Sequence, residues 1–174
     1  MNYRIGVIGS SEKESAGREE ARALGRKIAE ANCSLLTGGC TGLPYAAAEG
    51  AKEKGGLTLG VSPAANREDH RDEYQYPVEN YDLMVYTGFG YKGRTTILVR
   101  SCDAVIAVSG RIGTLNELTI AYAEGKVIGL LEGVPGAADE FKDLLNRLDL
   151  PPRKVVSSSD PVELVNTVIE ELGE

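Results

Sequence analysis

The sequence predicts an α/β protein with a doubly wound, mostly parallel sheet of the Rossmann-like kind and helices on both faces. Three observations predict this class. Short apolar stretches alternate with longer segments of helical periodicity along the whole chain. In the central apolar stretch the odd-numbered and the even-numbered residues are both apolar, which is typical of strands covered by helices on both faces. Several stretches end in glycine or serine, where doubly wound sheets bind their ligands.

Length and composition favour one soluble domain spanning residues 1–174, since 42% of residues are hydrophobic and 26% are charged. The formal net charge is −7, and acids and bases are interspersed. This argues against a nucleic-acid polymer or an anionic membrane as partner, but a small anion can still bind locally. The N-terminus runs directly into an apolar strand without the pattern of a signal peptide, and no apolar run reaches membrane-spanning length.

The cysteine pattern gives no sign of a disulfide framework or a zinc site. Cys33, Cys40 and Cys102 are odd in number and scattered, and they form neither a CxxC motif nor a cluster with histidine. We therefore expect a reducing, cytoplasmic environment and no metal. Cys40 lies within a glycine loop, where a lone thiol is more often a small spacer than a nucleophile.

The first strand is expected over residues 3–8 and the first helix over residues 16–31, where apolar residues recur at helical spacing. Gly9 and Ser10 follow this strand. They are candidate ligand-binding residues because they lie at a carboxyl end, although a plain connection is the simpler alternative.

A second strand at 33–36 leads through a glycine loop to an alanine-rich helix at 45–54. Gly38, Gly39 and Gly42 lie between strand and helix, where backbone N–H groups can cradle a phosphate. The loop is not a P-loop, because no Gly-Lys-Ser/Thr follows. A tight turn without a ligand is the alternative.

The third strand, at 57–61, is followed by a polar and acidic segment, residues 64–81, that has no clean periodicity. So long an excursion is typical of a functional flap, an interface or a mobile loop. It contains the one histidine of the chain, His70. His70 could act as a general acid, but its many charged neighbours favour a solvated residue.

A fourth strand at 82–86 and a helix at 91–102 place Arg94 near a helix N-terminus. The helix dipole disfavours a cation there. The position therefore indicates a ligand or a carboxylate partner, with an ordinary surface arginine as the alternative.

The central strand, at 103–108, feeds a loop with the candidate ligand residues Ser109, Gly110, Arg111, Gly113 and Thr114 and then a helix. Such a loop exposes backbone N–H groups at the positive end of a helix dipole, which suits a phosphate. Helical side chains lean toward the helix N-terminus, so the carboxylate of Glu117 should lie close to this loop and its anion site. The alternative is that Glu117 only stabilises the positive end of the helix dipole.

The remaining segments predict strands and helices of the fold, and none of their residues is a candidate for the site. We expect strands at 127–131 and 154–156 and helices at 137–148 and 162–172. Asp160 and Pro161 supply an N-cap and a first-turn proline for the last helix.

Two of these motifs resemble those of the LOG-like family, Rossmann-like proteins long labelled lysine decarboxylase-like. Residues 37–43, Thr-Gly-Gly-Cys-Thr-Gly-Leu, resemble its first glycine motif. Its second motif reads roughly PGGxGTxxE, of which this chain keeps Gly113-Thr114-Leu-Asn-Glu117. Arg94 stands nine positions before Asp103, matching a basic residue of the family.

Family members of the phosphoribohydrolase type cleave the N-glycosidic bond of nucleoside 5′-monophosphates. The resemblance implies that Gly110, Gly113 and Thr114 bind the phosphate, that Glu117 acts on the ribose and that Arg94 completes the catalytic pair. An ionised carboxylate would stabilise the oxocarbenium-like centre that forms as the base leaves. We expect Glu117, beside a helix N-terminus, to stay ionised.

Where this chain departs from the family pattern, it resembles a branch of the family that includes molybdenum-cofactor carrier proteins. Ser109-Gly110-Arg111 replaces Pro-Gly-Gly, and Pro44-Tyr45 replaces the Met-Gly pair usual in the hydrolases. Two hypotheses follow, a glycosidase and a non-catalytic carrier of a phosphorylated ligand, with a nucleotide sensor as a third. An Arg111 that points into the crevice favours a carrier, and one that points to solvent leaves the hydrolase open.

The resemblance also implies partners. No cofactor is required, and molybdenum cofactor is a candidate cargo. Members of the family are commonly dimers, so we expect a homo-oligomer, formed through the helix that carries Arg94 and Arg100.

Overall fold

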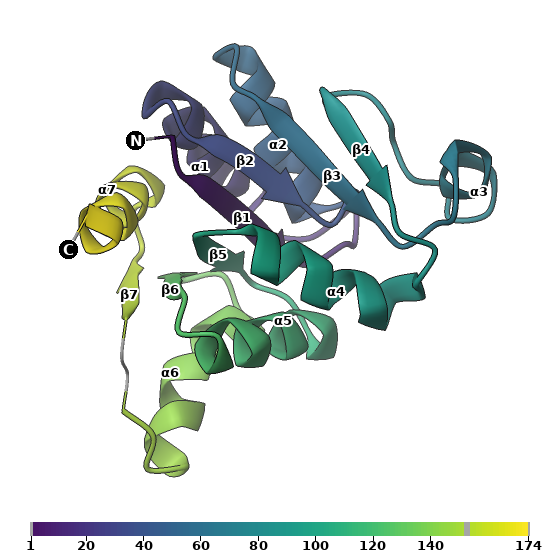
Figure 1. Ribbon diagram of the computed structural model, residues 1–174. Helices are drawn as coiled ribbons and strands as arrows, with labels where there is room; N and C mark the ends of the chain where they lie inside the picture. Colours follow the sequence, from purple (N-terminus) through teal and green to yellow (C-terminus); the bar gives the residue numbers. More distant parts are fainter. Residues whose placement is uncertain (1, 152–153, 174) are drawn as a thin grey trace.

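The computed structural model describes residues 2–151 and 154–173. Its strands form one parallel seven-stranded sheet with the order β4-β3-β2-β1-β5-β6-β7, which confirms the predicted fold class (Figure 1). The strands are β1 (Arg4–Gly9), β2 (Ser34–Thr37), β3 (Thr58–Ser62), β4 (Leu83–Tyr86), β5 (Ala104–Val108), β6 (Val127–Leu131) and β7 (Val155–Ser158). The helices are α1 (Arg18–Glu30), α2 (Leu43–Glu53), α3 (Arg67–Asp72), α4 (Gly90–Ser101), α5 (Ile112–Ala123), α6 (Ala137–Arg147) and α7 (Pro161–Gly173).

The strand order reverses between β1 and β5. β1 pairs with β2 on one side and with β5 on the other, in a register that places Gly9 beside Val108. Connections from these two strands leave toward opposite halves of the sheet, so a crevice opens at their carboxyl ends. This topological switch point is where the structure places the candidate site.

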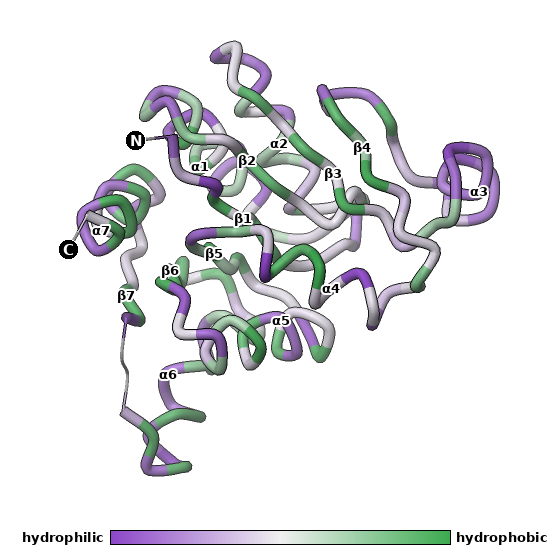
Figure 2. The backbone as a smooth tube through the Cα atoms, viewed as in Figure 1, coloured by the Kyte–Doolittle hydropathy of each residue, from purple (hydrophilic) through white to green (hydrophobic). Residues whose placement is uncertain are grey.

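Two helical layers cover the sheet. α1, α2 and α7 pack on one face, and α4, α5 and α6 pack on the other (Figure 1). β5, the predicted central strand, is buried at every residue. The central strands are largely hydrophobic, whereas α3 is largely hydrophilic and α7 carries residues of both kinds (Figure 2). Burial of these apolar side chains is the main force that stabilises the sheet against its helices.

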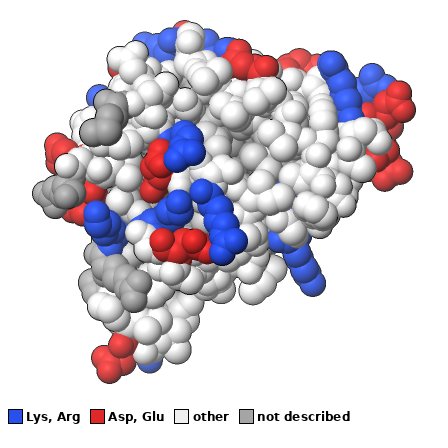
Figure 3. Space-filling model, in the orientation of Figure 1, with Lys and Arg blue, Asp and Glu red and all other residues white. Residues whose placement is uncertain are grey.

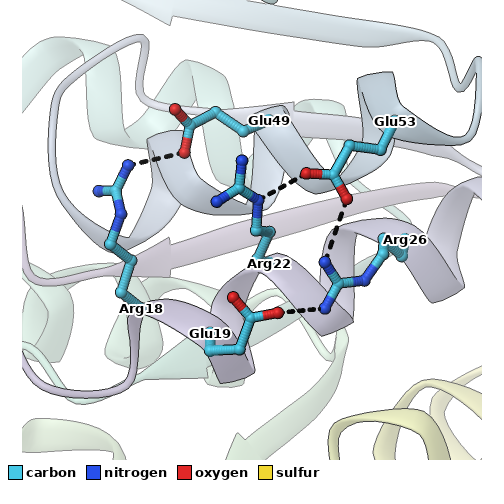
Figure 4. Close-up of polar contacts among 6 residues, drawn as sticks. All are labelled: Arg18, Glu19, Arg22, Arg26, Glu49 and Glu53. Carbon is cyan, nitrogen blue, oxygen red and sulfur yellow. Dashed lines mark hydrogen bonds and ion pairs between the residues drawn. The ribbon is translucent and has the colours of Figure 1, made fainter.

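α1 and α2 pack at close range because small residues line their contact. A Cβ atom on Gly25 would lie 1.9 Å from the Ala47 carbonyl oxygen, and one on Gly50 would lie 2.0 Å from that of Arg22. Above this contact, arginines of α1 pair with glutamates of both helices (Figure 4). These pairs are partly exposed, so each stabilises the fold by less than about 1 kcal/mol.

One part of the sheet carries no helix of the described chain. Leu59 of β3 lies beside Leu83 of the edge strand β4, and the side chains of Leu83 and Val85 are 55% and 41% exposed. Figure 3 shows a broad surface over β3, β4 and α4 that is nearly free of charged side chains.

The excursion at 64–81 contains a helix that the sequence analysis did not predict. α3 follows Asn66, whose side chain accepts a hydrogen bond of 2.9 Å from the Asp69 N–H. It lies beyond the carboxyl ends of β3 and β4 (Figure 1). The other elements match their predictions to within a few residues at each end. No helix in the described ranges has the length and apolarity needed to cross a membrane.

Candidate functional site

A cavity of about 320 Å³ lies at the switch point, within the range usual for small-ligand sites. It is lined by β1 and the loop after it, the glycine loop after β2, the segment 64–81, the loop after β5, the start of α2, and the first two turns of α4 and α5. The lining residues are Val7, Ile8, Gly9, Ser10, Ser11, Glu12, Gly38, Cys40, Pro44, Tyr76, Tyr91, Arg94, Thr95, Arg111, Gly113, Thr114 and Glu117. We call this the central cavity.

A buried ion pair forms the floor of the central cavity. Arg94 Nη1 donates a hydrogen bond of 3.2 Å to Glu117 Oε1, and the two side chains are only 8% and 10% exposed. This confirms the prediction of a carboxylate partner for Arg94. The Nε of Arg94 is also buried, and no described residue accepts a hydrogen bond from it. The guanidinium therefore retains donor capacity that the protein does not use.

Gly38 makes room for this guanidinium. A Cβ atom at Gly38 would lie 2.2 Å from Arg94 Nη1 and 2.7 Å from its central carbon. The glycine loop after β2 thus lets the cation sit at the end of the sheet, beneath the cavity. This role differs from the phosphate cradle that the sequence predicts for the loop.

The protonation of Glu117 departs from the expectation. Burial raises its pKa to about 7, while the nearby charge of Arg94 and the hydrogen bond from it lower the pKa by less. The prediction of a fully ionised carboxylate is therefore wrong near neutral pH. The sequence shows the favourable helix dipole but not the depth of burial, and burial has the larger effect on the pKa.

The N-terminus of α5 opens into the central cavity. No side chain of the described residues caps this helix, so its first N–H groups are available to a ligand. Gly113 and Thr114 line the cavity there, and a Cβ atom at Gly113 would have no described atom within 4 Å. Uncapped N–H groups and the positive end of the helix dipole together favour an anion at this position.

Arg111 lies at the mouth of the cavity. Its side chain is 77% exposed, and its Nη1 lies 2.7 Å from Oε1 of Glu12. Both residues line the cavity, and their pair joins the loop after β5 to the loop after β1. Arg111 therefore does not fill the phosphate loop. Its side chain points mostly to solvent at the rim, which leaves the hydrolase hypothesis open.

The structure brings together eight of the residues predicted from the sequence, all of which line the central cavity: Gly9, Ser10, Gly38, Arg94, Arg111, Gly113, Thr114 and Glu117. The other four candidates do not line it. Gly39 and Gly42 have left-handed φ angles that shape the turn before α2, and Ser10 accepts a backbone hydrogen bond from Leu43 next to this turn.

The remaining two of these four, Ser109 and Gly110, hold the start of α6. The Ser109 hydroxyl donates to the Pro135 carbonyl oxygen at 2.7 Å, and the Gly110 carbonyl accepts from Ala137 N–H at 2.8 Å. Both residues therefore bond to the segment that begins α6.

Sequence analysis missed two tyrosines of the cavity wall. Tyr76 comes from the excursion at 64–81 and Tyr91 from the first turn of α4, and their hydroxyls lie 2.9 Å apart. The excursion thus contributes directly to the site. Its length was the signal for a functional segment, but nothing local indicated which residue would reach the cavity.

His70 is fully buried, so the prediction of a solvated residue is wrong. Its Nε2 lies 3.0 Å from the Pro77 carbonyl oxygen, which can only accept, so Nε2 carries the proton. Nδ1 then accepts from the Ser62 hydroxyl at 2.8 Å. The His70 carbonyl also accepts from Tyr76 N–H. His70 therefore positions the segment that carries Tyr76.

The thiol of Cys40 is not activated. Burial raises its pKa to about 11, so it stays protonated at neutral pH. This agrees with the prediction of a small spacer in the glycine loop. The described residues contain no group of three His, Cys, Asp or Glu side chains placed to hold a metal ion.

Fold and cavity together define a Rossmann-like protein that binds a small ligand at its switch point. The chain belongs to the SLOG cluster4 family, whose sequence model matches residues 2–165. This confirms the predicted LOG-like relationship. An uncharacterized protein of Archaeoglobus fulgidus is 36% identical over 129 residues, which cover 74% of this chain and 80% of that protein.

Solved structures support the same branch. TM1055, a structural-genomics target, is 27% identical, with a TM-score of 0.82 over 98% of this chain and 99% of its own. The molybdenum cofactor binding protein of Rippkaea orientalis is 30% identical, with a TM-score of 0.79 over 97% of this chain and 98% of its own. The molybdenum cofactor carrier protein of Chlamydomonas reinhardtii is 29% identical, with a TM-score of 0.79 over the full length of both chains.

More distant neighbours share the fold alone. DNA processing protein A of Helicobacter pylori, titled for its single-stranded DNA binding mode, is 17% identical, with a TM-score of 0.68 over 97% of this chain and 81% of its own. At 17% identity this similarity shows a shared fold and says nothing about the ligands of this chain.

Proposed function

We propose that this protein is a carrier that binds a phosphorylated heterocyclic ligand of the molybdenum-cofactor type in the central cavity. The phosphate would lie at the N-terminus of α5, against Gly113 and Thr114. Arg94 would lie beneath it, and Arg111 would contact the ligand at the rim. The cavity combines a buried cation at its floor with an exposed arginine at its rim, and both charges suit an anionic ligand.

The observation that supports this proposal most is the buried guanidinium of Arg94. It is paired with a single carboxylate whose pKa is raised to about 7, and its Nε has no acceptor among the described residues. A positive charge with spare donors is costly to bury, and an anionic ligand would offset that cost. The likeness to two molybdenum-cofactor proteins supports the choice of ligand.

A retention experiment tests the carrier. The purified protein is mixed with cofactor released from a molybdoenzyme and passed through a size-exclusion filter, and protein-bound molybdenum is measured. We expect the parent to retain molybdenum and Arg94→Met to lose at least about nine-tenths of it. Lys27→Ala, a change in the last turn of α1 away from the cavity, should match the parent. A parent that retains none would contradict the carrier proposal.

A phosphoribohydrolase is the second candidate, because Arg94 and Glu117 both line the cavity. Release of free base from a panel of nucleoside 5′-monophosphates tests it. Release by the parent and not by Glu117→Gln would favour the hydrolase over the carrier. A folded parent that releases no base from any nucleotide would contradict it for those substrates.

We also propose that the chain forms a homo-oligomer and acts in the cytoplasm, where its three buried thiols stay reduced. The interface through α4 stays a prediction, in which Arg100 is exposed and Arg94 points into the cavity. We propose that the interface includes the uncovered apolar face around Leu83 and Val85. Leu83→Asp should convert an oligomer to a monomer in analytical ultracentrifugation, whereas Leu148→Asp, at another exposed leucine, should not. A monomeric parent would contradict this proposal.

A further inference from the structure

The central cavity holds a carboxylate close to the position proposed for an anion. Glu117 and Gly113 both line the cavity, and they lie four residues apart on α5, so they share one face of this helix. A phosphate bound to the uncapped N–H groups of α5 would therefore lie beside Glu117. Two negative charges so close together repel each other, and burial strengthens the repulsion because it excludes water.

The same carboxylate already occupies the cation that the ligand needs. Arg94 Nη1 donates to Glu117 Oε1, and both side chains are buried. While Glu117 is ionised, the pair carries no net charge, so the floor of the cavity offers an incoming anion little attraction. When Glu117 is protonated, the floor carries the full charge of Arg94. The protonated form is thus the one that matches an anionic ligand.

Two contacts confine Arg94 to this position. One is the pair with Glu117, and the other is the glycine loop, which packs directly against the guanidinium. A Cβ atom at Gly38 would lie 2.2 Å from Nη1, 2.7 Å from the central carbon and 2.9 Å from Nη2. Arginine also stays charged at every pH that a protein meets. The member of the pair that can change its charge when a ligand arrives is therefore Glu117.

The other groups around Glu117 differ from it in burial or in pKa. The charged and titratable residues that line the cavity with it are Glu12, Cys40, Tyr76, Tyr91, Arg94 and Arg111. Glu12 is exposed and paired with Arg111 at the mouth. Burial raises the pKa of Cys40 to about 11, raises that of Tyr76 above its ordinary value, and raises that of Cys102, after α4, to about 12. These thiols and this hydroxyl are therefore already protonated near neutral pH.

We infer that the central cavity binds its phosphorylated ligand together with one proton, which passes from solvent to a carboxylate oxygen of Glu117. This inference rests on the proposed function, because the phosphate must occupy the central cavity. Protonated Glu117 no longer repels the phosphate, and it gains an O–H that can donate a hydrogen bond to it. Because the bound state holds the extra proton, binding weakens as the pH rises above the pKa of Glu117, about 7 in the free protein. A rise in pH therefore favours release of the ligand.

Calorimetric titration with AMP at pH 8, in two buffers of different ionisation enthalpy, counts the protons. The phosphate of AMP is already dianionic at this pH, since its second pKa is about 6, so the ligand itself contributes little. We expect the parent to take up between about 0.5 and 1 proton per AMP bound. Its affinity should fall about fivefold to tenfold from pH 7.5 to pH 8.5, because uptake of one proton limits the change to about tenfold per pH unit.

Two variants assign the proton. Glu117→Gln keeps the shape of the side chain but cannot ionise, so it should take up less than about 0.2 proton, and its affinity for AMP should change less than about twofold over the same pH interval. Glu12→Gln is the matched control, because it removes the exposed carboxylate at the mouth of the same cavity. It should take up as many protons as the parent.

The outcomes separate this inference from the proposed function. A parent that binds AMP without proton uptake overturns the inference and leaves the phosphate site intact, and this measurement needs no variant to fold. Equal proton uptake by the parent and Glu117→Gln also overturns it, because another group would then take the proton. A parent that does not bind AMP overturns the phosphate site and the inference with it.

Discussion

Arg94 Nη1 lies 3.2 Å from Glu117 Oε1, and this pair joins the second turns of two helices that follow different strands. Arg94 comes from α4, after β4, and Glu117 comes from α5, after β5. They meet because the carboxyl ends of parallel strands lie at one edge of the sheet. The buried pair and the uncapped N-terminus of α5 together make this edge suitable for an anion.

The pH dependence of stability should reveal the burial of Glu117. Its pKa in the folded protein, about 7, lies above the ordinary value of 4.5. The folded state therefore holds a proton that the unfolded state loses first, and stability decreases as the pH rises through this interval.

Glu117→Gln removes this titration. We compare the free energy of unfolding of the parent with that of Glu117→Gln at each pH. The parent value minus the variant value should decrease by roughly 2 to 3 kcal/mol between pH 4 and pH 8, since one pKa unit corresponds to about 1.4 kcal/mol. Urea denaturation at a series of pH values measures it. A constant difference between the two proteins would contradict the raised pKa.

Arg94→Met should abolish the anion site. The methionine side chain keeps part of the apolar stem but removes the charge and all the donors. Affinity for a phosphorylated ligand should fall by about 100-fold, since hydrogen bonds to charged groups contribute about 1.5 to 3 kcal/mol each. Arg94→Lys keeps a charge but lacks the planar fork, and it should lose less. Calorimetric titration with AMP measures both, and equal affinity for the parent and Arg94→Met would contradict this assignment.

Gly38→Ala should weaken binding through the position of Arg94. The added Cβ would lie 2.2 Å from Arg94 Nη1, so the guanidinium must move. We expect an affinity for AMP about tenfold lower and an overpacking cost of about 1 to 3 kcal/mol in urea denaturation. Gly173→Ala, whose added Cβ would have no described atom within 4 Å, is the control. Unchanged binding by Gly38→Ala would show that the site tolerates a displaced guanidinium.

Ser62→Ala should loosen the wall formed by Tyr76. The Ser62 hydroxyl accepts from Ala64 N–H and donates to His70 Nδ1, so its loss leaves two buried groups unsatisfied. The expected cost is about 1 to 3 kcal/mol, with faster hydrogen exchange at the Tyr76 amide. The Ser101 hydroxyl donates to the Ile97 carbonyl, one turn back in α4, so Ser101→Ala should cost less. Equal effects of the two variants would contradict the positioning role of His70.

The sequence was sufficient for most of the fold and for the location of the site. β5 has a continuous apolar pattern, and the glycines that follow the strands mark their carboxyl ends, so the parallel sheet and its ligand edge could be predicted. Arg94 could be assigned a partner because a cation at a helix N-terminus conflicts with the dipole. These are local signals with a direct physical meaning.

The errors concern burial, which depends on packing between distant segments. Charged neighbours suggested a solvated His70, but α3 turns its polar residues outward and this one side chain toward Ser62. For Glu117 the helix dipole was visible in the sequence and the desolvation was not. The reach of Tyr76 into the site likewise depends on the fold of residues 64–81, which have no clean periodicity.

The most direct test of the account is an NMR titration of the ¹⁵N-labelled protein with AMP. We predict saturable shifts of the Gly113 and Thr114 amides and of the Arg94 side-chain Nε–H, because the phosphate would bind at the N-terminus of α5 above the guanidinium. Absence of saturable shifts at these three groups, with the protein folded and AMP at millimolar concentration, would contradict a phosphate site in the central cavity.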